Sequence, residues 1–105
     1  MADAATISWN ASQGNYFRVT LAGNRTINGG TSPKDGQRVM FEFIQDGTGG
    51  RTVTFENGTT HFRFGSDTIR ADCTLSTGVA STDYVAAVWK QAASQWDVQA
   101  CSRGF

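Results

Sequence analysis

Residues with reactive side chains are few in this chain and lie far apart in the sequence. Carboxylates that hydrolyse glycosidic bonds work in pairs. The acidic residues that fall at expected turns or outward strand positions are Asp46, Glu56, Asp67, Asp72, Asp83 and Asp97. The single histidine, His61, has no serine or cysteine nucleophile motif beside it. We therefore expect no enzyme activity, since a glycosidase pair would require two distant carboxylates to converge in the fold.

The two cysteines, Cys73 and Cys101, are the other reactive groups. With one histidine and no Cys-x-x-Cys pair, we expect neither a metal ion nor a cofactor. A disulfide is feasible, but spacing alone does not establish one. The first residues, MADAATISWN, lack the basic and apolar stretches of a secretory signal, which favours two partly buried thiols in a reducing cytosol. Both states remain open at this stage.

Two glycine-rich segments could present backbone groups to a ligand. The loop Asp46–Gly50 exposes backbone amides, but it lacks the Gly-Lys-Ser/Thr ending of a phosphate-binding loop and no helix follows it, so we interpret it as a turn. The segment Asn28–Gln37 holds the only proline, Pro33. We expect this segment to be an exposed functional loop or a connection between two sheets.

The composition indicates a small all-β domain. The chain has 105 residues, enough for one domain spanning residues 1–105. Nine basic residues balance nine acidic ones, which argues against nucleic acid or an anionic membrane as the partner, and no apolar stretch is long enough to span a membrane. The sequence contains 12 glycines and is rich in threonine, whereas the helix formers leucine and glutamate each appear only twice. Seven Phe, three Trp and two Tyr supply apolar area for a core.

Turn signals recur every 8 to 12 residues or so, which is typical of a sandwich or barrel. Alternation predicts strands at Thr6–Trp9 and, in a half-buried antiparallel pattern, at Tyr16–Leu21. Arg38–Glu56 is predicted to form a hairpin around the glycine-rich loop. The residues expected to face the core from this hairpin are Val39, Phe41, Phe43, Val53 and Phe55.

The last third of the chain is harder to interpret. His61–Phe64 is predicted as a short aromatic strand with Phe62 and Phe64 on one face, and His61 as a rim residue. Ser81–Trp96 carries apolar residues at spacings that slightly favour a helix. The alternative is a strand, a turn through Gln91–Gln95 and a second strand with Trp96, Val98 and Ala100 on one face.

Several longer stretches carry a resemblance to a known family. These stretches are LAGNRTI, DGQRVMFEFIQDGTGGRTVTF, FRFGSDT, CTLST and TDYVAAVWKQAASQWDVQACSRGF. From about Thr6 to Phe105, the sequence resembles a β-sandwich module of tailed-bacteriophage virion proteins, used in tail fibres, head fibres and capsid-bound accessory proteins. The resemblance implies an antiparallel, jelly-roll-like β-sandwich of about eight short strands without a substantial helix, in which residues 1–9 form an N-terminal arm and first strand. It also implies that Ser81–Trp96 belongs to a closing hairpin.

The resemblance implies a virion protein assembled in the host bacterial cytoplasm. Because no collagen-like, coiled-coil or repeat segment is attached, we expect a capsid decoration or head-spike subunit that binds the major capsid protein or another virion protein and stabilises the shell. An exposed sheet edge favours a homo-oligomer, with a trimer preferred. The alternative is a tail-fibre or spike-tip module that recognises carbohydrate on the host surface.

Termini and loops can conform to a partner while the sheets hold their shape. The expected partner contacts are therefore Trp9, Asn28, Pro33, Lys34 and Asp35. Trp9 is equally interpretable as a core residue, and Trp89 and Trp96 are expected in the core or a subunit interface. For a host glycan, the expected hydrogen-bonding residues are Asn28, Lys34, Asp35, Asp67 and Arg70.

Overall fold

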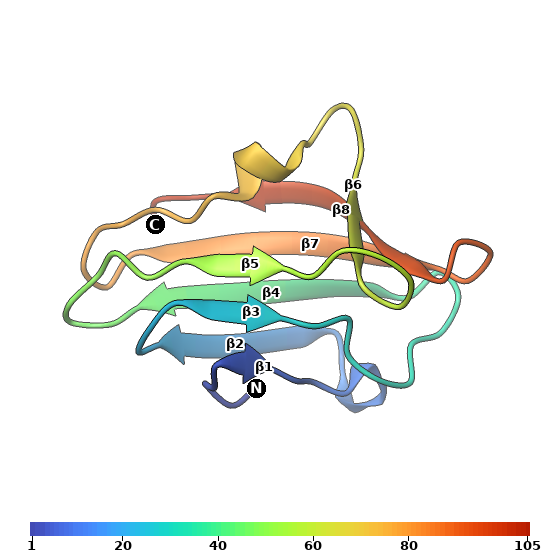
Figure 1. Cartoon of the computed structure of the whole chain (residues 1–105), viewed down its shortest axis with the longest axis horizontal. Coiled ribbons are helices and arrows are strands. Elements are labelled where there is room, and N and C mark those ends of the chain that lie inside the picture. Colours follow the sequence, from blue (N-terminus) through green and yellow to red (C-terminus); the bar gives the residue numbers. More distant parts are fainter.

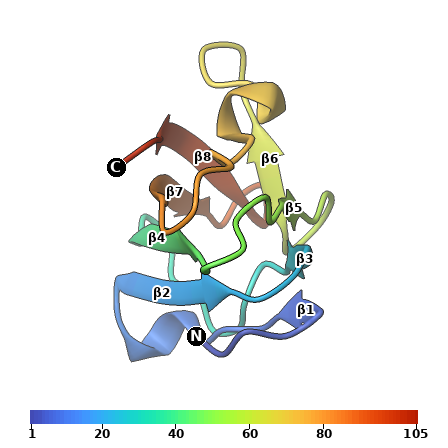
Figure 2. The same cartoon turned by 90° about the vertical axis from the view of Figure 1, so that its left-hand side faces the viewer.

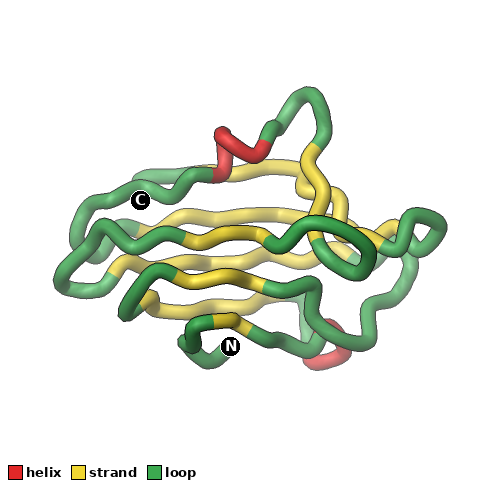
Figure 3. The backbone as a smooth tube through the Cα atoms, in the orientation of Figure 1, coloured by secondary structure: helices red, strands yellow, loops and turns green.

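Alternating apolar and polar residues give each strand one apolar face, and the strands form two stacked sheets (Figures 1 and 2). A computed structural model describes all residues, 1–105. The strands are β1 (Thr6–Ile7), β2 (Tyr16–Leu21), β3 (Arg25–Ile27), β4 (Arg38–Gln45), β5 (Val53–Phe55), β6 (Phe62–Phe64), β7 (Thr82–Lys90) and β8 (Gln95–Ser102). The helical segments are two short 3₁₀ helices, η1 (Ala11–Gln13) and η2 (Arg70–Cys73) (Figure 3). The prediction of an all-β chain with about eight strands is confirmed.

The chain alternates between the two sheets over its first six strands. One sheet has the order β1-β3-β5 and the other β2-β4-β7-β8-β6. Each crossing reverses the direction of the chain, so strands two apart in the sequence run parallel: β1 with β3, β3 with β5, and β2 with β4. The antiparallel prediction is therefore wrong for Tyr16–Leu21, which pairs in parallel with β4. Antiparallel pairing is found between β4 and β7 and between β7 and β8, and the sandwich is mixed.

The predicted hairpin over Arg38–Glu56 is also wrong. The glycine-rich turn joins β4 to β5, but the two strands lie in opposite sheets. They contact each other through side chains: the ring centroids of Phe43 and Phe55 are 5.9 Å apart. The buried amide of Gln45 holds the turn by accepting from the backbone N–H of Arg51 and donating to its carbonyl oxygen. Asp46 pairs with Arg51, whose hydrogen bond lowers the pKa of Asp46 to about 2.

The closing segment is the antiparallel hairpin β7–β8, and the helical interpretation of Ser81–Trp96 is wrong. Burial alternates along β7 with period two, so Val85 and Trp89 share a face on a strand as they would on a helix. A register shift opposite Ala86 and Ala87 interrupts the ladder between Val98 and Ala100. This bulge leaves Ala100 exposed, which corrects its expected place beside Trp96 and Val98 on the buried face.

Aromatic rings fill the space between the sheets. Phe41 and Trp96 are fully buried, and Trp9 is 6% exposed with its ring centroid 4.8 Å from that of Phe41 and 5.2 Å from that of Trp96. The indole N–H of Trp9 donates to the carbonyl oxygen of Asn28, and that of Trp96 donates to the carbonyl oxygen of Gly29. A Cβ atom at Gly29 would collide with the backbone of Thr60, so this close approach requires glycine.

Cys73 and Cys101 form a disulfide that ties η2 to β8. The preference for free thiols is therefore wrong. The disulfide anchors the long connection between β6 and β7, which has no regular structure except η2. Neither η1 nor η2 combines the length and apolar character that crossing a membrane requires.

Candidate functional site

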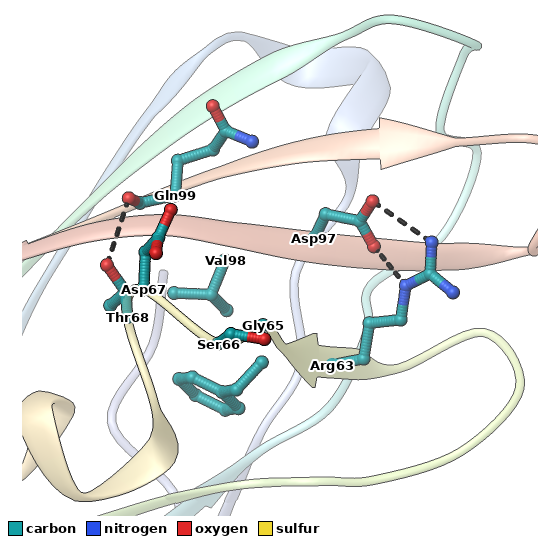
Figure 4. A pocket seen from close by; sticks show the side chains of 9 residues that line it. Arg63, Gly65, Ser66, Asp67, Thr68, Asp97, Val98 and Gln99 are labelled. Carbon is teal, nitrogen blue, oxygen red and sulfur yellow. Dashed lines mark hydrogen bonds and ion pairs between the residues drawn. The ribbon is translucent and has the colours of Figure 1, made fainter.

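A polar pocket lies between β8 and the segment that follows β6 (Figure 4). Its volume is about 570 Å³. One wall is residues 63–68 and the other is residues 97–99. Figure 4 shows Arg63 and Asp97 facing each other on one side, Asp67, Thr68 and Gln99 grouped on the other, and Ser66 and Val98 between them.

The ion pair on one side of the pocket comes from two adjacent strands. Arg63 on β6 and Asp97 on β8 are partners in the parallel ladder, so their side chains project side by side. Asp97 accepts from Nε and from Nη2 of Arg63, the latter at 3.1 Å. The hydrogen bond to Asp97 raises the pKa of Arg63. Since a guanidinium group has five N–H donors, three of them remain available to a ligand.

The other side of the pocket presents side chains without protein partners. The Asp67 carboxylate and the Gln99 amide make no hydrogen bond to the rest of the chain, and both residues are exposed. The hydroxyl of Thr68 donates to the backbone carbonyl of Gln99 at 3.3 Å and links the two walls. Gln99 lies at the bulge of β8, and bulges commonly redirect a side chain beside a binding site.

The side chains of the pocket combine hydrogen-bond donors and acceptors on a small apolar base. Arg63, Ser66 and Gln99 can donate, whereas Asp67 when ionised, and Thr68, whose hydroxyl proton is already donated to Gln99, can only accept. Phe64 and Val98 are the two apolar lining residues. Such a lining suits a ligand with several hydroxyl groups, each of which both donates and accepts.

The segment Asn28–Gln37 connects β3 to β4, and so it joins the two sheets while lying exposed at one end of the sandwich (Figure 1). Two hollows, of about 420 and 440 Å³, flank it. Lys34 and Asp35 line the first and Pro33 lines the second. Asp35 is partly committed to the fold, because its carboxylate accepts from the backbone N–H of Gln91 at 3.0 Å.

Trp9 and Asn28 differ from Pro33, Lys34 and Asp35, because their side chains are engaged within the fold. Trp9 is a core residue, which decides between its two interpretations. The Asn28 amide donates to the hydroxyl of Ser8 at 3.0 Å and accepts from the N–H of Gly30 at 2.9 Å, so both ends are occupied within the chain.

Of the residues expected to bind a glycan, Asp67 alone lies in the polar pocket. The guanidinium carbon of Arg70 lies 4.5 Å from the ring centroid of Phe64, and the guanidinium group donates to the carbonyl oxygen of Phe55. Arg70 therefore stabilises the fold. Sequence reasoning missed Arg63, Ser66, Thr68 and Gln99 as pocket residues. The outward position of Arg63 on its strand was the one signal that pointed to it.

Comparison with known families gives one match. A family model described as "Putative phage tail fibre C-terminal domain" matches residues 6–80, well over half of the chain. The chain belongs to this tail-fibre domain family. It is therefore a phage structural protein and a virion component, and the resemblance to phage virion modules is confirmed. No curated protein matches the chain, and no solved structure does.

The match to this tail-fibre family bears on both functional hypotheses. It fits the tail-fibre alternative better than the capsid decoration hypothesis, which it does not support. The matched region includes β6 and the pocket wall that follows it, whereas the opposite wall on β8 lies beyond the matched residues.

Proposed function

We propose that this chain is the host-binding domain of a phage tail fibre and that the polar pocket between β6 and β8 binds carbohydrate of the host surface. The observation that carries the proposal is the pocket itself, in which unpartnered polar side chains line an open space. Its volume of about 570 Å³ lies within the range of about 300 to 1,000 Å³ that is common for small-ligand sites. The family match supplies the tail-fibre context.

The charges of the pocket favour a neutral sugar. Arg63 is neutralised by Asp97, and the carboxylate of Asp67 remains without a partner. An acidic sugar brought beside Asp67 would meet a like charge, which costs binding free energy. A neutral hexose or deoxyhexose instead offers hydroxyl groups that Asp67 can accept from and Gln99 can donate to.

Truncating the two unpartnered side chains tests the pocket. Each of Asp67→Ala and Gln99→Ala removes one or two ligand hydrogen bonds, at about 1 to 1.5 kcal/mol in total, so we expect each to weaken binding of purified host surface polysaccharide about fivefold to tenfold. Isothermal titration calorimetry measures the affinity. Thermal melting should be nearly unchanged, because neither side chain makes a hydrogen bond or an ion pair within the chain and both residues are exposed.

Two control variants locate the site. Thr54→Ala removes a small polar side chain from the outer face of the three-stranded sheet, and should leave the affinity unchanged. Asp35→Ala alters the loop end of the sandwich. If Asp35→Ala weakens binding while Asp67→Ala and Gln99→Ala do not, then the polar pocket is not the binding site.

A further inference from the structure

The connection between β6 and β7 carries one wall of the polar pocket and has a single buried anchor. Residues 65–68 of this connection form the wall. From residue 65 to residue 74, every residue is exposed or half-buried except Cys73, which is 3% exposed. The Cys73 side chain is bonded to that of Cys101 on β8. The wall is therefore tied to the core through one side chain, and that side chain is half of a disulfide.

Side-chain hydrogen bonds supply the other tethers of this stretch. They join Thr68 to Gln99, Arg70 to Phe55 and Asn57, and Arg103 to Thr74. The bond from Arg70 to the carbonyl oxygen of Phe55 is partly buried, whereas the others are exposed. Water can replace an exposed partner when the stretch opens, so these bonds resist opening only weakly. The disulfide is the one tether for which water does not compete.

We propose that the Cys73–Cys101 disulfide is a thiol-sensitive switch on the polar pocket. The intact bridge holds residues 65–68 in place for the ligand, and reduction of the bridge by a small thiol loosens this wall. The opposite wall stays in place, because β8 is paired with β7. A wall that keeps its binding arrangement for only part of the time lowers the apparent affinity in proportion. The inference rests on the proposed function, since it concerns the affinity of the same pocket.

The reduction is a thiol–disulfide exchange. The thiolate of the small molecule attacks Sγ of Cys101, the bond between the two cysteine sulfurs breaks, and its electron pair leaves on Sγ of Cys73, which takes up a proton from water. A second small thiol attacks the mixed disulfide and releases Cys101 as a thiol. Two small thiols are thereby oxidised to one disulfide while the protein disulfide gains their two electrons. A small-molecule disulfide restores the bridge by the reverse steps.

Access to the two sulfur atoms sets the direction of the attack. Cys101 lies near the end of β8 and is half-buried, whereas Cys73 is buried against the core. Exchange requires the thiolate to reach the sulfur that it attacks, so Cys101 is the expected target. A brief reaction with glutathione followed by alkylation with N-ethylmaleimide tests this direction. Peptide mapping by mass spectrometry should find glutathione on Cys101 and the alkyl group on Cys73, and the reverse pattern would contradict it.

The switch suits a component of the virion. A virion protein is synthesised inside a cell, where thiols are kept reduced, and it meets the next host outside, where disulfides persist. The pocket would therefore bind weakly during synthesis and reach its full affinity after release.

Calorimetric titration of purified host surface polysaccharide into the oxidised chain and into the chain reduced with dithiothreitol tests the switch. Reduction should weaken binding about tenfold, which corresponds to a wall that is ordered about a tenth of the time. The matched control is the double variant Cys73→Ser, Cys101→Ser. It should bind as weakly as the reduced chain and should not respond to dithiothreitol.

Limited digestion with trypsin measures the wall without a ligand. Arg70 lies in the stretch that the bridge anchors, and cleavage after it requires local opening. Reduction should accelerate this cleavage. The matched control is cleavage after Lys34, in the exposed loop between β3 and β4, which should proceed at the same rate in both redox states.

The outcomes separate this inference from the proposed function. If the oxidised chain binds the polysaccharide, equal affinity after reduction overturns the switch. Loss of the fold on reduction, seen by circular dichroism, also overturns it, because a switch requires a folded reduced chain. An oxidised chain that does not bind the polysaccharide defeats the proposed function. In that case, faster cleavage after Arg70 in the reduced chain still supports control of the wall by the bridge, and unchanged cleavage overturns it.

Discussion

Replacing Phe41 with alanine is expected to lower the free energy of unfolding by about 3 to 5 kcal/mol. The Phe41 side chain is fully buried, and its ring contacts those of Trp9, Phe17, Phe43 and Phe62. Truncation removes the apolar area of the ring and leaves a cavity that surrounding rings of fixed geometry fill only in part. Urea denaturation followed by tryptophan fluorescence measures the loss.

A second core variant and a surface variant serve as comparisons for Phe41→Ala. Phe55→Ala removes a buried ring from the opposite sheet and should cost a similar amount, since Phe55 packs on Phe43 and Phe62. Val79→Ala truncates an exposed apolar side chain in the connection before β7, and should change the stability by less than about 0.5 kcal/mol. If both phenylalanine variants melted like the wild type, the strand faces described here would be wrong.

Removing the disulfide is expected to have an effect of similar size. The double variant Cys73→Ser, Cys101→Ser should lose about 3 to 4 kcal/mol of unfolding free energy. The two cysteines are 28 residues apart, and the bridge restricts that loop in the unfolded chain. In the folded chain it also fixes η2 against β8, and the connection around η2 has little other regular structure to hold it.

Chemical reduction provides the matched control for the disulfide. The wild-type chain with reductant should unfold at the same urea concentration as the double variant, and the variant itself should not respond to reductant. Titration of thiols in the denatured, unreduced wild-type chain should find none. Two free thiols per chain in that titration would show that the bridge does not form.

Local sequence patterns predicted several strands and their buried faces, but not the strand nature of Ser81–Trp96, the exposure of Ala100 or how the strands combine. Phe41, Phe43 and Phe55 are buried and Thr54 is exposed, as alternation indicated. The same local signals, two apolar strands and a glycine-rich turn, are compatible with a hairpin within one sheet or with a crossing between two sheets. Contacts distant in sequence decide between them, such as the parallel pairing of β2 with β4 and of β3 with β5.

Within the candidate site, only Asp67 was predicted from the sequence as a binding residue. Arg63 and Asp97 are 34 residues apart, and they meet because β6 and β8 are adjacent in parallel register. Gln99 lies at the pocket wall at a bulge that follows from the register of β7 with β8. Neither feature has a local sequence signature. The loop holding Pro33 was recognisable as an exposed connection because glycine and proline mark such loops.

The most direct test of the proposed function is a titration of the labelled protein against host cells, their extracted surface polysaccharide and purified phage capsids. We predict saturable binding to the cells and to the polysaccharide, weakened by Asp67→Ala, and no binding to capsids. Saturable binding to capsids with no binding to cells or polysaccharide would contradict the proposed host-binding function.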